Sequence, residues 1–467
     1  MTTTQTTAAD IRERTWVQAL RATMTGDVID RSDARYDEAR RVWNGMIDRY
    51  PGAVARCADT ADVVAAVEVA RAHRPAVSIR GGGHQVAGSA VCDDGLVLDL
   101  STMTGIHVDA HTRTARVGAG ARWAELNRAT QRYGLVTPGG EVSETGVAGL
   151  TLGGGLGALQ RAFGLSCDSL RSVEIVTADG TVRRASTQHH PDLFWAVRGG
   201  GRGLGVVTEF EFDLYPLGPQ VANALVLYPY EEARSVLAAW RTLVDRLPDT
   251  VSPEFALWSV PPDPEIPAEM HGTPVVLVAG LYAGDAQEGL DVLAPMARLG
   301  TPLLDATGIV DYTASQSGLD ALFPAGGRYY FTSHFLDDVD DAVAAALVAA
   351  DADRPNPESL IIIRTLGGAV ARVGAGDSAF AHRRARFNVS FDAGWSDPAL
   401  DGTAIGWARS GWAALRPFAT GGVYVNFAGL GEDIDRAATY GRHAARLTEI
   451  QRIYDPDRIL VEAAGCP

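Results

Sequence analysis

The sequence predicts an α+β protein whose second half forms an antiparallel sheet covered by helices. Residues 53–80 read as strand, helix, strand. After Pro216, longer apolar runs alternate with helical stretches, which is typical of one sheet with helices packed against it. Hydrophobic residues make up 46% and charged residues 21% of the 467 residues, as in soluble globular proteins, and this length allows two or three domains.

The first half is expected to contain short strands joined by helices. A helix follows Asp59 or Thr60 as its cap and stops at Pro75, and a second helix over residues 122–134 ends at Gly134. Asp179-Gly180 predicts a hairpin within residues 171–186. The other predicted strands are "AVARC" (53–57), "AVSIR" (76–80), "GLVLDL" (95–100), "TARVGAG" (114–120) and "GVVTEFEFDLYP" (205–216).

The second half is expected to supply the longer strands and their covering helices. Helices are predicted over residues 230–247 and 337–352. Strands are predicted in "VANALVLYPY" (221–230), "PEFALWSV" (253–260), "TPVVLVAGLYAG" (273–284), "SLIIIRTLGG" (359–368), "RARFNVSFDAGW" (384–395) and "GGVYVNFAGL" (421–430).

Composition and motifs exclude several classes of function. The net charge of −16 disfavours nucleic acids and anionic membranes as partners. No apolar run reaches the roughly 18 residues of a membrane span, and the N-terminus lacks signal-peptide character, so a cytoplasmic location is expected. The four cysteines are scattered, which argues against a zinc site or a disulfide framework, and neither a P-loop nor a G-x-S-x-G elbow occurs. The oligomeric state stays open.

Three glycine-dense stretches stand out in the first half, at residues 78–88, 144–170 and 190–210. Successive main-chain N–H groups exposed by glycine bind anions, and a pyrophosphate needs many such donors. In the first stretch, "SIRGGGHQVAG", the glycines lead directly to His84; a tight turn beside a structural histidine is the alternative. "GGGLGALQ" fits a Rossmann loop poorly, because Ala158 stands where the third glycine belongs.

The order and spacing of several motifs resemble those of the FAD-linked oxidases of the berberine bridge enzyme type, in the vanillyl alcohol oxidase superfamily. The motifs include "RGGGHQVAG", "TPGGEVSETGVAGLTLGGGLG", "HHPDLFWAVRGGGRGLGVVTEFEFDLYP" and "YVNFAG". The resemblance, which runs from about residue 50 to 458, implies a PCMH-type FAD-binding domain made from both ends of the chain, with a central substrate domain. The implied parts are residues 1–216, 217–417 and 418–467.

The resemblance also implies how the chain binds its cofactor. His84 would join covalently to the 8α-methyl carbon of FAD, and a neutral imidazole is a suitable nucleophile. Val207 would lie near the adenine. The remaining residues implied to hold FAD are Arg80, Gly81, Gly82, Gly83, Gln85, Gly88, Thr145, Gly146, Gly149, Gly153, Gly154 and Gly155.

Three departures from the family pattern bear on these expectations. Val142 stands where many relatives carry a cysteine that makes a second covalent link, so a single link is expected. The third stretch has Arg202-Gly203-Leu204-Gly205 in place of the frequent G-N-F-G. The C-terminal "ILVEAAGCP" replaces the usual tail, which leaves flavin contacts there open.

On the substrate side, a base must take a proton within hydrogen-bonding reach. Relatives point to Tyr424 as base or as its positioning group, with Asn426 on the same face of the predicted strand. Tyr329 and Tyr330 compete for this role, and His334 and Arg364 are candidates for pocket polarity; structural roles are the alternative for each.

The resulting hypothesis is an FAD-dependent oxidoreductase that oxidises a small organic molecule, such as a secondary metabolite, alcohol, sugar or amine, with O2 as acceptor and no metal. A dehydrogenase that uses another acceptor, or a catalytically silent flavin- or metabolite-binding protein, is the alternative. Fold does not fix the substrate.

Overall fold

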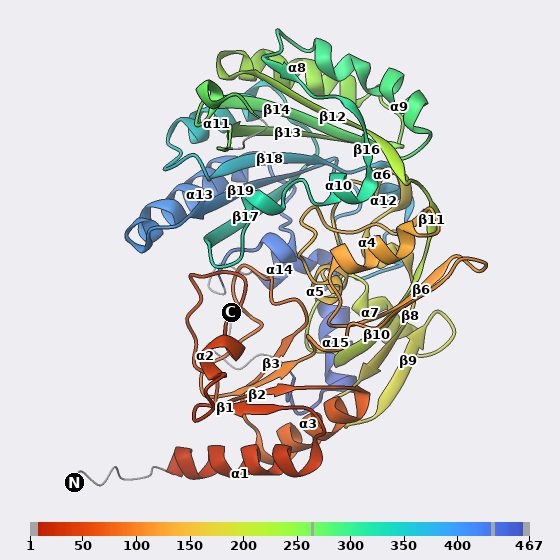
Figure 1. Ribbon diagram of the computed structural model, residues 1–467, viewed down its shortest axis with the longest axis vertical. Helices are drawn as coiled ribbons and strands as arrows, with labels where there is room; N and C mark the ends of the chain where they lie inside the picture. The colour runs from red at the N-terminus through yellow and green to blue at the C-terminus, as the bar shows by residue number, and fades with distance from the viewer. Residues whose placement is uncertain (1–7, 263–265, 431–434, 461–467) are drawn as a thin grey trace.

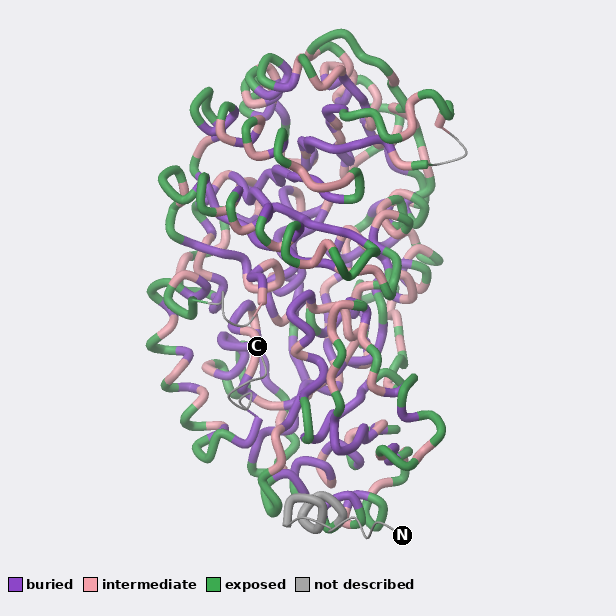
Figure 2. Tube along the Cα trace, turned by 90° about the vertical axis from the view of Figure 1, so that its left-hand side faces the viewer, coloured by how far each residue is buried: buried purple, intermediate pink, exposed green. Residues whose placement is uncertain are grey.

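A computed structural model describes residues 8–262, 266–430 and 435–460 of the chain. It confirms the α+β class: the chain forms open sheets with helices on their faces (Figure 1). Figure 2 shows buried residues running through the interior along the whole length of the molecule, with exposed residues on the outside. No helix among the described residues is long and apolar enough to cross a membrane.

A four-stranded sheet near the N-terminus has the order β1-β2-β4-β3. Its strands are β1 (Val28–Asp30), β2 (Ala53–Arg56), β3 (Val77–Arg80) and β4 (Leu96–Asp99). The helix α3 (Thr60–His73) connects β2 to β3, and its cap Asp59 accepts a hydrogen bond from the Asp62 amide. Both β2 and β3 run parallel to β4. Gly81, Gly82 and Gly83 follow directly at the carboxyl end of β3.

A second sheet, of five antiparallel strands, has the order β5-β6-β10-β8-β9. Its strands are β5 (Ile106–Asp109), β6 (Thr114–Gly118), β8 (Leu170–Val176), β9 (Val182–Ser186) and β10 (Val206–Asp213). A short pair joins β7 (Leu135–Val136) to β11 (Tyr215–Pro216). The hairpin predicted around Asp179-Gly180 is confirmed as β8 and β9.

The third sheet is antiparallel and contains eight strands, in the order β15-β12-β14-β13-β18-β19-β17 with β16 also paired to β12. Its strands are β12 (Gln220–Pro229), β13 (Val251–Ser259), β14 (Pro274–Tyr282), β15 (Leu304–Asp305), β16 (Gly308–Asp311), β17 (Arg328–Leu336), β18 (Leu360–Thr365) and β19 (Phe387–Trp395). Helices α8 (Ala233–Val244), α9 (Ala286–Leu293), α11 (Asp341–Ala352) and α13 (Asp401–Leu415) cover its outer face (Figure 1). The sheet covered by helices is therefore confirmed.

The two faces of this sheet differ in composition. Alternate residues such as Phe255, Ile363 and Val389 point to the covering helices and form one apolar core. The intervening residues, such as Ala256, Ile362 and Phe331, face the glycine-rich half of the chain. This alternation follows from the period of two along a strand, and it decides which side chains reach the pocket described below.

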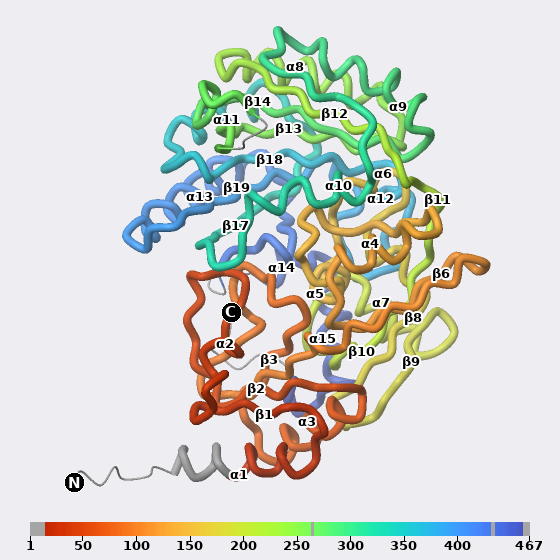
Figure 3. Tube along the Cα trace, in the orientation of Figure 1, coloured from red at the N-terminus to blue at the C-terminus, as the bar shows by residue number. Residues whose placement is uncertain are grey.

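The remaining helices lie between the sheets or on the outside (Figure 1). They are α1 (Ala8–Thr23), α2 (Tyr36–Ala39), α4 (Trp123–Gln131), α5 (Val147–Leu152), α6 (Gln160–Phe163), α7 (Pro191–Val197), α10 (Tyr312–Gln316), α12 (Gly368–Arg372), α14 (Arg436–Tyr440) and α15 (Ala444–Tyr454). Helix α1 packs against α3 at one end of the molecule (Figure 1). The chain returns at its C-terminal end to the N-terminal half, where α15 lies beside α7 (Figure 3). There the Gln451 amide donates to the Arg202 carbonyl at 2.7 Å.

One predicted strand is wrong, and the long strand β17 was not predicted. The stretch 421–430 forms no strand; residues Val425–Phe427 make a turn of 3₁₀ helix that begins after Tyr424. The edge strand β17 takes the place beside β19, where "RYYFTSHFL" supplies nine residues that the sequence analysis did not assign to a strand. The β-branched and apolar residues of "VYVNF" favour a strand, but two glycines precede them. The place beside β19 in the sheet is taken by β17.

Candidate FAD and substrate site

One elongated pocket lies between the glycine stretches and the eight-stranded sheet. All three glycine stretches contribute to its lining, although their residues are far apart in sequence. The residues predicted to hold FAD that line it are Gly81, Gly82, Gly83, His84, Gln85, Thr145, Gly146, Gly149, Gly153 and Val207. Tyr424 and Asn426 line the same pocket, so the structure brings the predicted cofactor and substrate groups together.

The first two glycine stretches pack backbone against backbone. A Cβ on Gly82 would lie 2.5 Å from the Gly146 nitrogen, so a side chain there would force the two segments apart. A Cβ on Gly149, in α5, would instead meet no atom within 4 Å. Gly149 thus leaves open the space that a flat ring or a phosphate would need.

The other predicted cofactor residues do not line the pocket. Arg80 is buried and donates to both Asp99 oxygens, at 3.2 and 2.7 Å, and to the Ala39 carbonyl. Gly154 and Gly155 have φ values of +119° and +88°, which favour glycine, and a Cβ on them would strike Phe380 or Ser166. Gly88 packs against Ile47. These four residues shape the loops around the pocket and do not form its surface.

His84 is held by an aromatic stack. Its imidazole lies 4.0 Å from the Trp43 ring at an interplanar angle of 17°, and Trp43 stacks in turn on Tyr329 at 4.1 Å. The Trp43 amide donates to the Gly83 carbonyl, and its indole N–H donates to the Phe323 carbonyl. The N-terminal segment therefore fixes the ring plane of His84, a contact that the glycine motif alone does not reveal.

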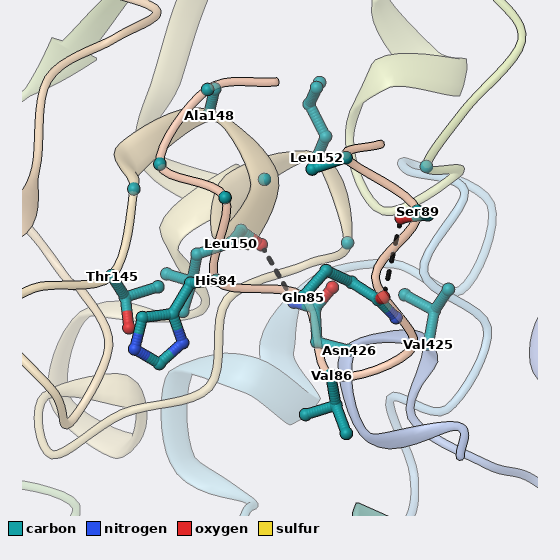
Figure 4. A pocket seen from close by; sticks show the side chains of 18 of the residues that line it. His84, Gln85, Val86, Ser89, Thr145, Ala148, Leu150, Leu152, Val425 and Asn426 are labelled. Carbon is teal, nitrogen blue, oxygen red and sulfur yellow. Dashed lines mark hydrogen bonds between the residues drawn. The ribbon is translucent and has the colours of Figure 1, made fainter. Parts of the chain in front are cut away.

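The protonation state of His84 follows from its surroundings. Burial lowers the pKa of His84 to about 4, so the imidazole is neutral at physiological pH. Its Nε2 is buried without a hydrogen-bond partner in the described part of the chain, and the same holds for the Gln85 amide nitrogen. Figure 4 shows both side chains with Thr145 around the pocket. Orphaned polar atoms beside open space are the expected signature of a group that a ligand completes.

Tyr424 is fully buried, and its hydroxyl oxygen is surrounded by donors. The amides of Gly155 and Leu156 donate to it at 3.1 and 3.2 Å, and the Asn426 side-chain amide donates at 2.8 Å. The Asn426 amide also donates to the Leu150 carbonyl (Figure 4). Burial raises the pKa of Tyr424 to about 12 despite these three hydrogen bonds, so the residue is a neutral phenol at neutral pH.

The competing residues on β17 and β18 lie in different places. Tyr330 points to the covering helices, where the Arg409 Nε donates to its hydroxyl at 3.3 Å, and His334 stacks on Trp412 on that same side. Tyr329 stacks on Trp43 and donates its hydroxyl proton to the Pro324 carbonyl. Arg364 alone of this group lines the pocket.

Arg364 belongs to a buried charged cluster that the sequence analysis missed. Its guanidinium binds Glu141 through Nε at 2.8 Å and lies 3.7 Å from Asp392, and both carboxylates line the pocket. A signal was available in "FNVSFD", because Asn388, Ser390 and Asp392 place a polar side chain at every second position of an otherwise apolar strand. Their period of two puts all three on the face opposite the covering helices.

Among the described residues, Cys57, Cys92 and Cys167 are buried. Cys466 and most of the atypical tail lie outside the described residues. No group of three or more histidine, cysteine or acidic side chains suited to a metal ion occurs within the described ranges.

Comparison with known proteins bears directly on this pocket. Residues 51–186 match the model of a family described as an FAD binding domain. Over 446 residues the chain is 29% identical to the uncharacterized FAD-linked oxidoreductase YgaK of Bacillus subtilis, which covers 93% of this chain and 95% of that protein. Over nearly its whole length the chain is similar to FAD-linked oxidoreductases, which supports an FAD-dependent oxidoreductase.

Two solved structures have a similar fold. BBE-like 1 from Physcomitrella patens superimposes with a TM-score of 0.86 at 24% identity, over 97% of this chain and 99% of that one. 6-Hydroxy-D-nicotine oxidase from Arthrobacter nicotinovorans gives 0.82 at 26% identity, over 93% and 96%. The resemblance to the berberine bridge enzyme type is thereby confirmed.

Proposed function

We propose that this FAD-linked oxidoreductase is an oxidase that carries FAD on a single covalent bond to His84, oxidises a small organic molecule and returns the electrons to O2. The observation that carries the proposal is His84 itself. It is neutral, it is held in one orientation by Trp43, its Nε2 is buried without a hydrogen-bond partner among the described residues, and it lines the same pocket as Gly149. Val142, on the same pocket wall, has no nucleophile, which supports one link rather than two.

The pocket fits the cofactor in its donors and in its free space. Gly81 to Gly83 and Thr145 to Gly149 would hold the pyrophosphate and ring, and Val207 would lie against the adenine end. The bound flavin would supply the two-electron chemistry, taking up a hydride from the substrate. In domain terms, residues 1–216 and 418–467 would hold the flavin and residues 217–417 would cover its ring.

Tyr424 would act as a hydrogen-bond donor to the substrate and not as the general base. With its oxygen lone pairs engaged by three N–H donors and its pKa near 12, Tyr424 is suited to donate its own proton to the reacting group and so to orient it. Asn426 fixes the phenol in that orientation. A positioned donor of this kind raises the rate through geometry.

The test of covalent attachment is denaturation. Flavin fluorescence should migrate with the denatured wild-type chain and be absent from His84→Ala, whereas the exposed His107→Ala should keep it. Flavin that stays with denatured His84→Ala would contradict the assignment.

The test of the acceptor is kinetic. The substrate-reduced protein should reoxidise in aerated buffer within seconds and release peroxide, as the oxidases among its structural neighbours suggest. A requirement for an added quinone or dye would make the protein a dehydrogenase. Failure of any small molecule to reduce the flavin would favour a silent flavin-binding protein.

A further inference from the structure

A buried carboxylate faces the pocket from the eight-stranded sheet. Asp392, on β19, is 1% exposed and lines the pocket together with Arg364 and Glu141. Its Oδ1 is buried and has no hydrogen-bond partner within the described parts of the chain. An unpaired buried carboxylate is costly, so its persistence at a pocket wall points to a ligand that completes it.

The nearby arginine does not neutralise this carboxylate. Arg364 holds Glu141 through Nε at 2.8 and 2.9 Å and through a second nitrogen at 2.8 Å, and it donates to the Ser390 hydroxyl at 2.8 Å. Its closest approach to Asp392 is 3.7 Å, to Oδ2, which is beyond a hydrogen bond. Arg364 thus makes its hydrogen bonds to Glu141 and Ser390 and reaches Asp392 only as a longer ion pair, which leaves the Asp392 Oδ1 without a partner among the described residues.

The other groups around Asp392 add no positive charge. Glu254 on β13 lies opposite Arg364 in the strand register, and burial together with Glu141 raises its pKa well above the usual range. Burial likewise raises the pKa of Asp392, but only to about 6, because Arg364 and Ser390 oppose it. The cluster therefore sets one guanidinium, that of Arg364, among three acidic side chains, Glu141, Glu254 and Asp392.

The surrounding wall is aromatic. Phe323, Phe331 and Phe427 line the pocket, and Phe331 contacts Phe427 edge-on at 5.9 Å. Ring faces attract cations, and a polyhydroxylated ligand would find few partners on phenylalanine rings. One anionic carboxylate within an apolar aromatic wall is complementary to a protonated nitrogen on an apolar body.

We propose that the substrate is an amine, protonated when it binds, and that the phenylalanine rings pack around its apolar part while Asp392 holds its cationic nitrogen. Asp392 takes up the nitrogen-bound proton before the hydride leaves the adjacent carbon, so that the neutral nitrogen can then accept the hydrogen bond of Tyr424. This assignment rests on the proposed function, since it places the amine over the flavin site. It selects one class among the alcohols, sugars and amines that the fold accommodates.

The experiment uses the flavin-loaded protein without oxygen and two ligands of the same shape. N,N-Dimethylbenzylamine is protonated near neutral pH, and isobutylbenzene has the same skeleton with CH in place of NH⁺. Binding is followed by the change in the flavin absorption spectrum. The amine should bind about tenfold more tightly than the hydrocarbon or better, the range of a hydrogen bond to a charged group.

Asp392→Asn keeps the shape of the side chain and removes its charge. It should weaken amine binding by about tenfold or more and leave hydrocarbon binding unchanged. The control Asp338→Asn removes a carboxylate that pairs with Arg241 on the side of the covering helices. It should leave the affinity for both ligands unchanged.

Several outcomes would overturn the proposal: equal affinity of the wild-type protein for both ligands, no amine binding at millimolar concentration, or an Asp392→Asn variant that still prefers the amine. The wild-type comparison decides the matter even if the variant does not fold. A protein that carries no flavin would instead contradict the proposed function, and its missing flavin spectrum would reveal this before any ligand is added.

Discussion

One wall of the pocket is formed largely by main-chain atoms, and the other is formed by side chains. On the wall formed by residues 77–207, glycine main chain and apolar side chains form much of the surface, together with the polar side chains of His84, Gln85 and Glu141. On the wall formed by the sheet, aromatic rings and the charged groups of Arg364 and Asp392 form it. A backbone wall recognises a constant ligand through repeated N–H donors, whereas a side-chain wall can change residue by residue. Sequence motifs can therefore predict the cofactor, whereas predicting the substrate requires the three-dimensional arrangement of the side chains.

The largest expected effect is on the rate of flavin reduction when Tyr424 is changed. Tyr424→Phe should slow anaerobic flavin reduction by about a hundredfold, because the reacting group loses the donor that orients it. It also leaves the amides of Gly155 and Leu156 without their acceptor, at about 1–3 kcal/mol for each unsatisfied group. Stopped-flow reduction and a thermal melt separate the two effects.

The exposed Tyr133→Phe serves as the control and should alter neither quantity. A Tyr424→Phe variant that reduces its flavin within about threefold of the wild-type rate would remove Tyr424 from the mechanism.

A substitution on the backbone wall tests whether the open space is needed. Gly149→Val places two methyl groups into the space beside α5, where a Cβ meets no atom within 4 Å. FAD content per chain should fall by about tenfold or more, since overpacked sites lose several kcal/mol. Flavin absorbance of the purified protein measures it.

Gly406→Val is the matched control, because Gly406 is also a helical glycine with open space at its Cβ, on α13. Both variants carry the same helix-propensity cost, so equal loss of FAD in the two would mean that Gly149 acts through folding alone.

A smaller effect is expected from the stack that orients His84. Trp43→Leu removes a ring contact of about 0.5–1.5 kcal/mol, so covalent attachment of FAD to the apo-protein should slow by about two- to tenfold and still reach completion. The time course of acid-stable flavin gives the rate. Trp412→Leu, which removes a comparable stack on His334 away from the pocket, should leave that rate unchanged. An unaffected rate in Trp43→Leu would show that the glycine loop orients His84 unaided.

The smallest expected effect is in the pH dependence of the same reaction. Burial lowers the pKa of His84 to about 4, so lowering the pH from about 8 to about 5.5 leaves most of the imidazole neutral. Attachment should therefore change by less than about twofold across this range, whereas a histidine of ordinary pKa near 6.5 would lose about tenfold of its neutral form. A tenfold loss of rate would place His84 in contact with solvent.

Both the predicted and the missed parts of the site have physical causes. His84 and the glycines were predictable because a short loop carries its own geometry, and a strand such as β19 was predictable from its apolar run. Tyr424 and Asn426 were predicted to share a strand face; they do meet, but through a 3₁₀ turn and a direct hydrogen bond. Of the two tyrosines on β17, Tyr330 lies on the face that packs against the covering helices. The sequence could not predict this, because it depends on the register of β17 against β19.

The sequence by itself determined the α+β class, the hairpin at Asp179-Gly180 and the three glycine stretches, with His84 directly after the glycines of the first, because each depends on residues within about one element of one another. Only the tertiary structure decided that Trp43 stacks on His84, that Arg364 pairs with Glu141 across 223 positions, and that Asp392 is left unpaired at the pocket. A charged side chain's neighbours are set by how distant strands and loops pack. The charge balance of the pocket, and with it the class of substrate, therefore emerges only when the chain is folded.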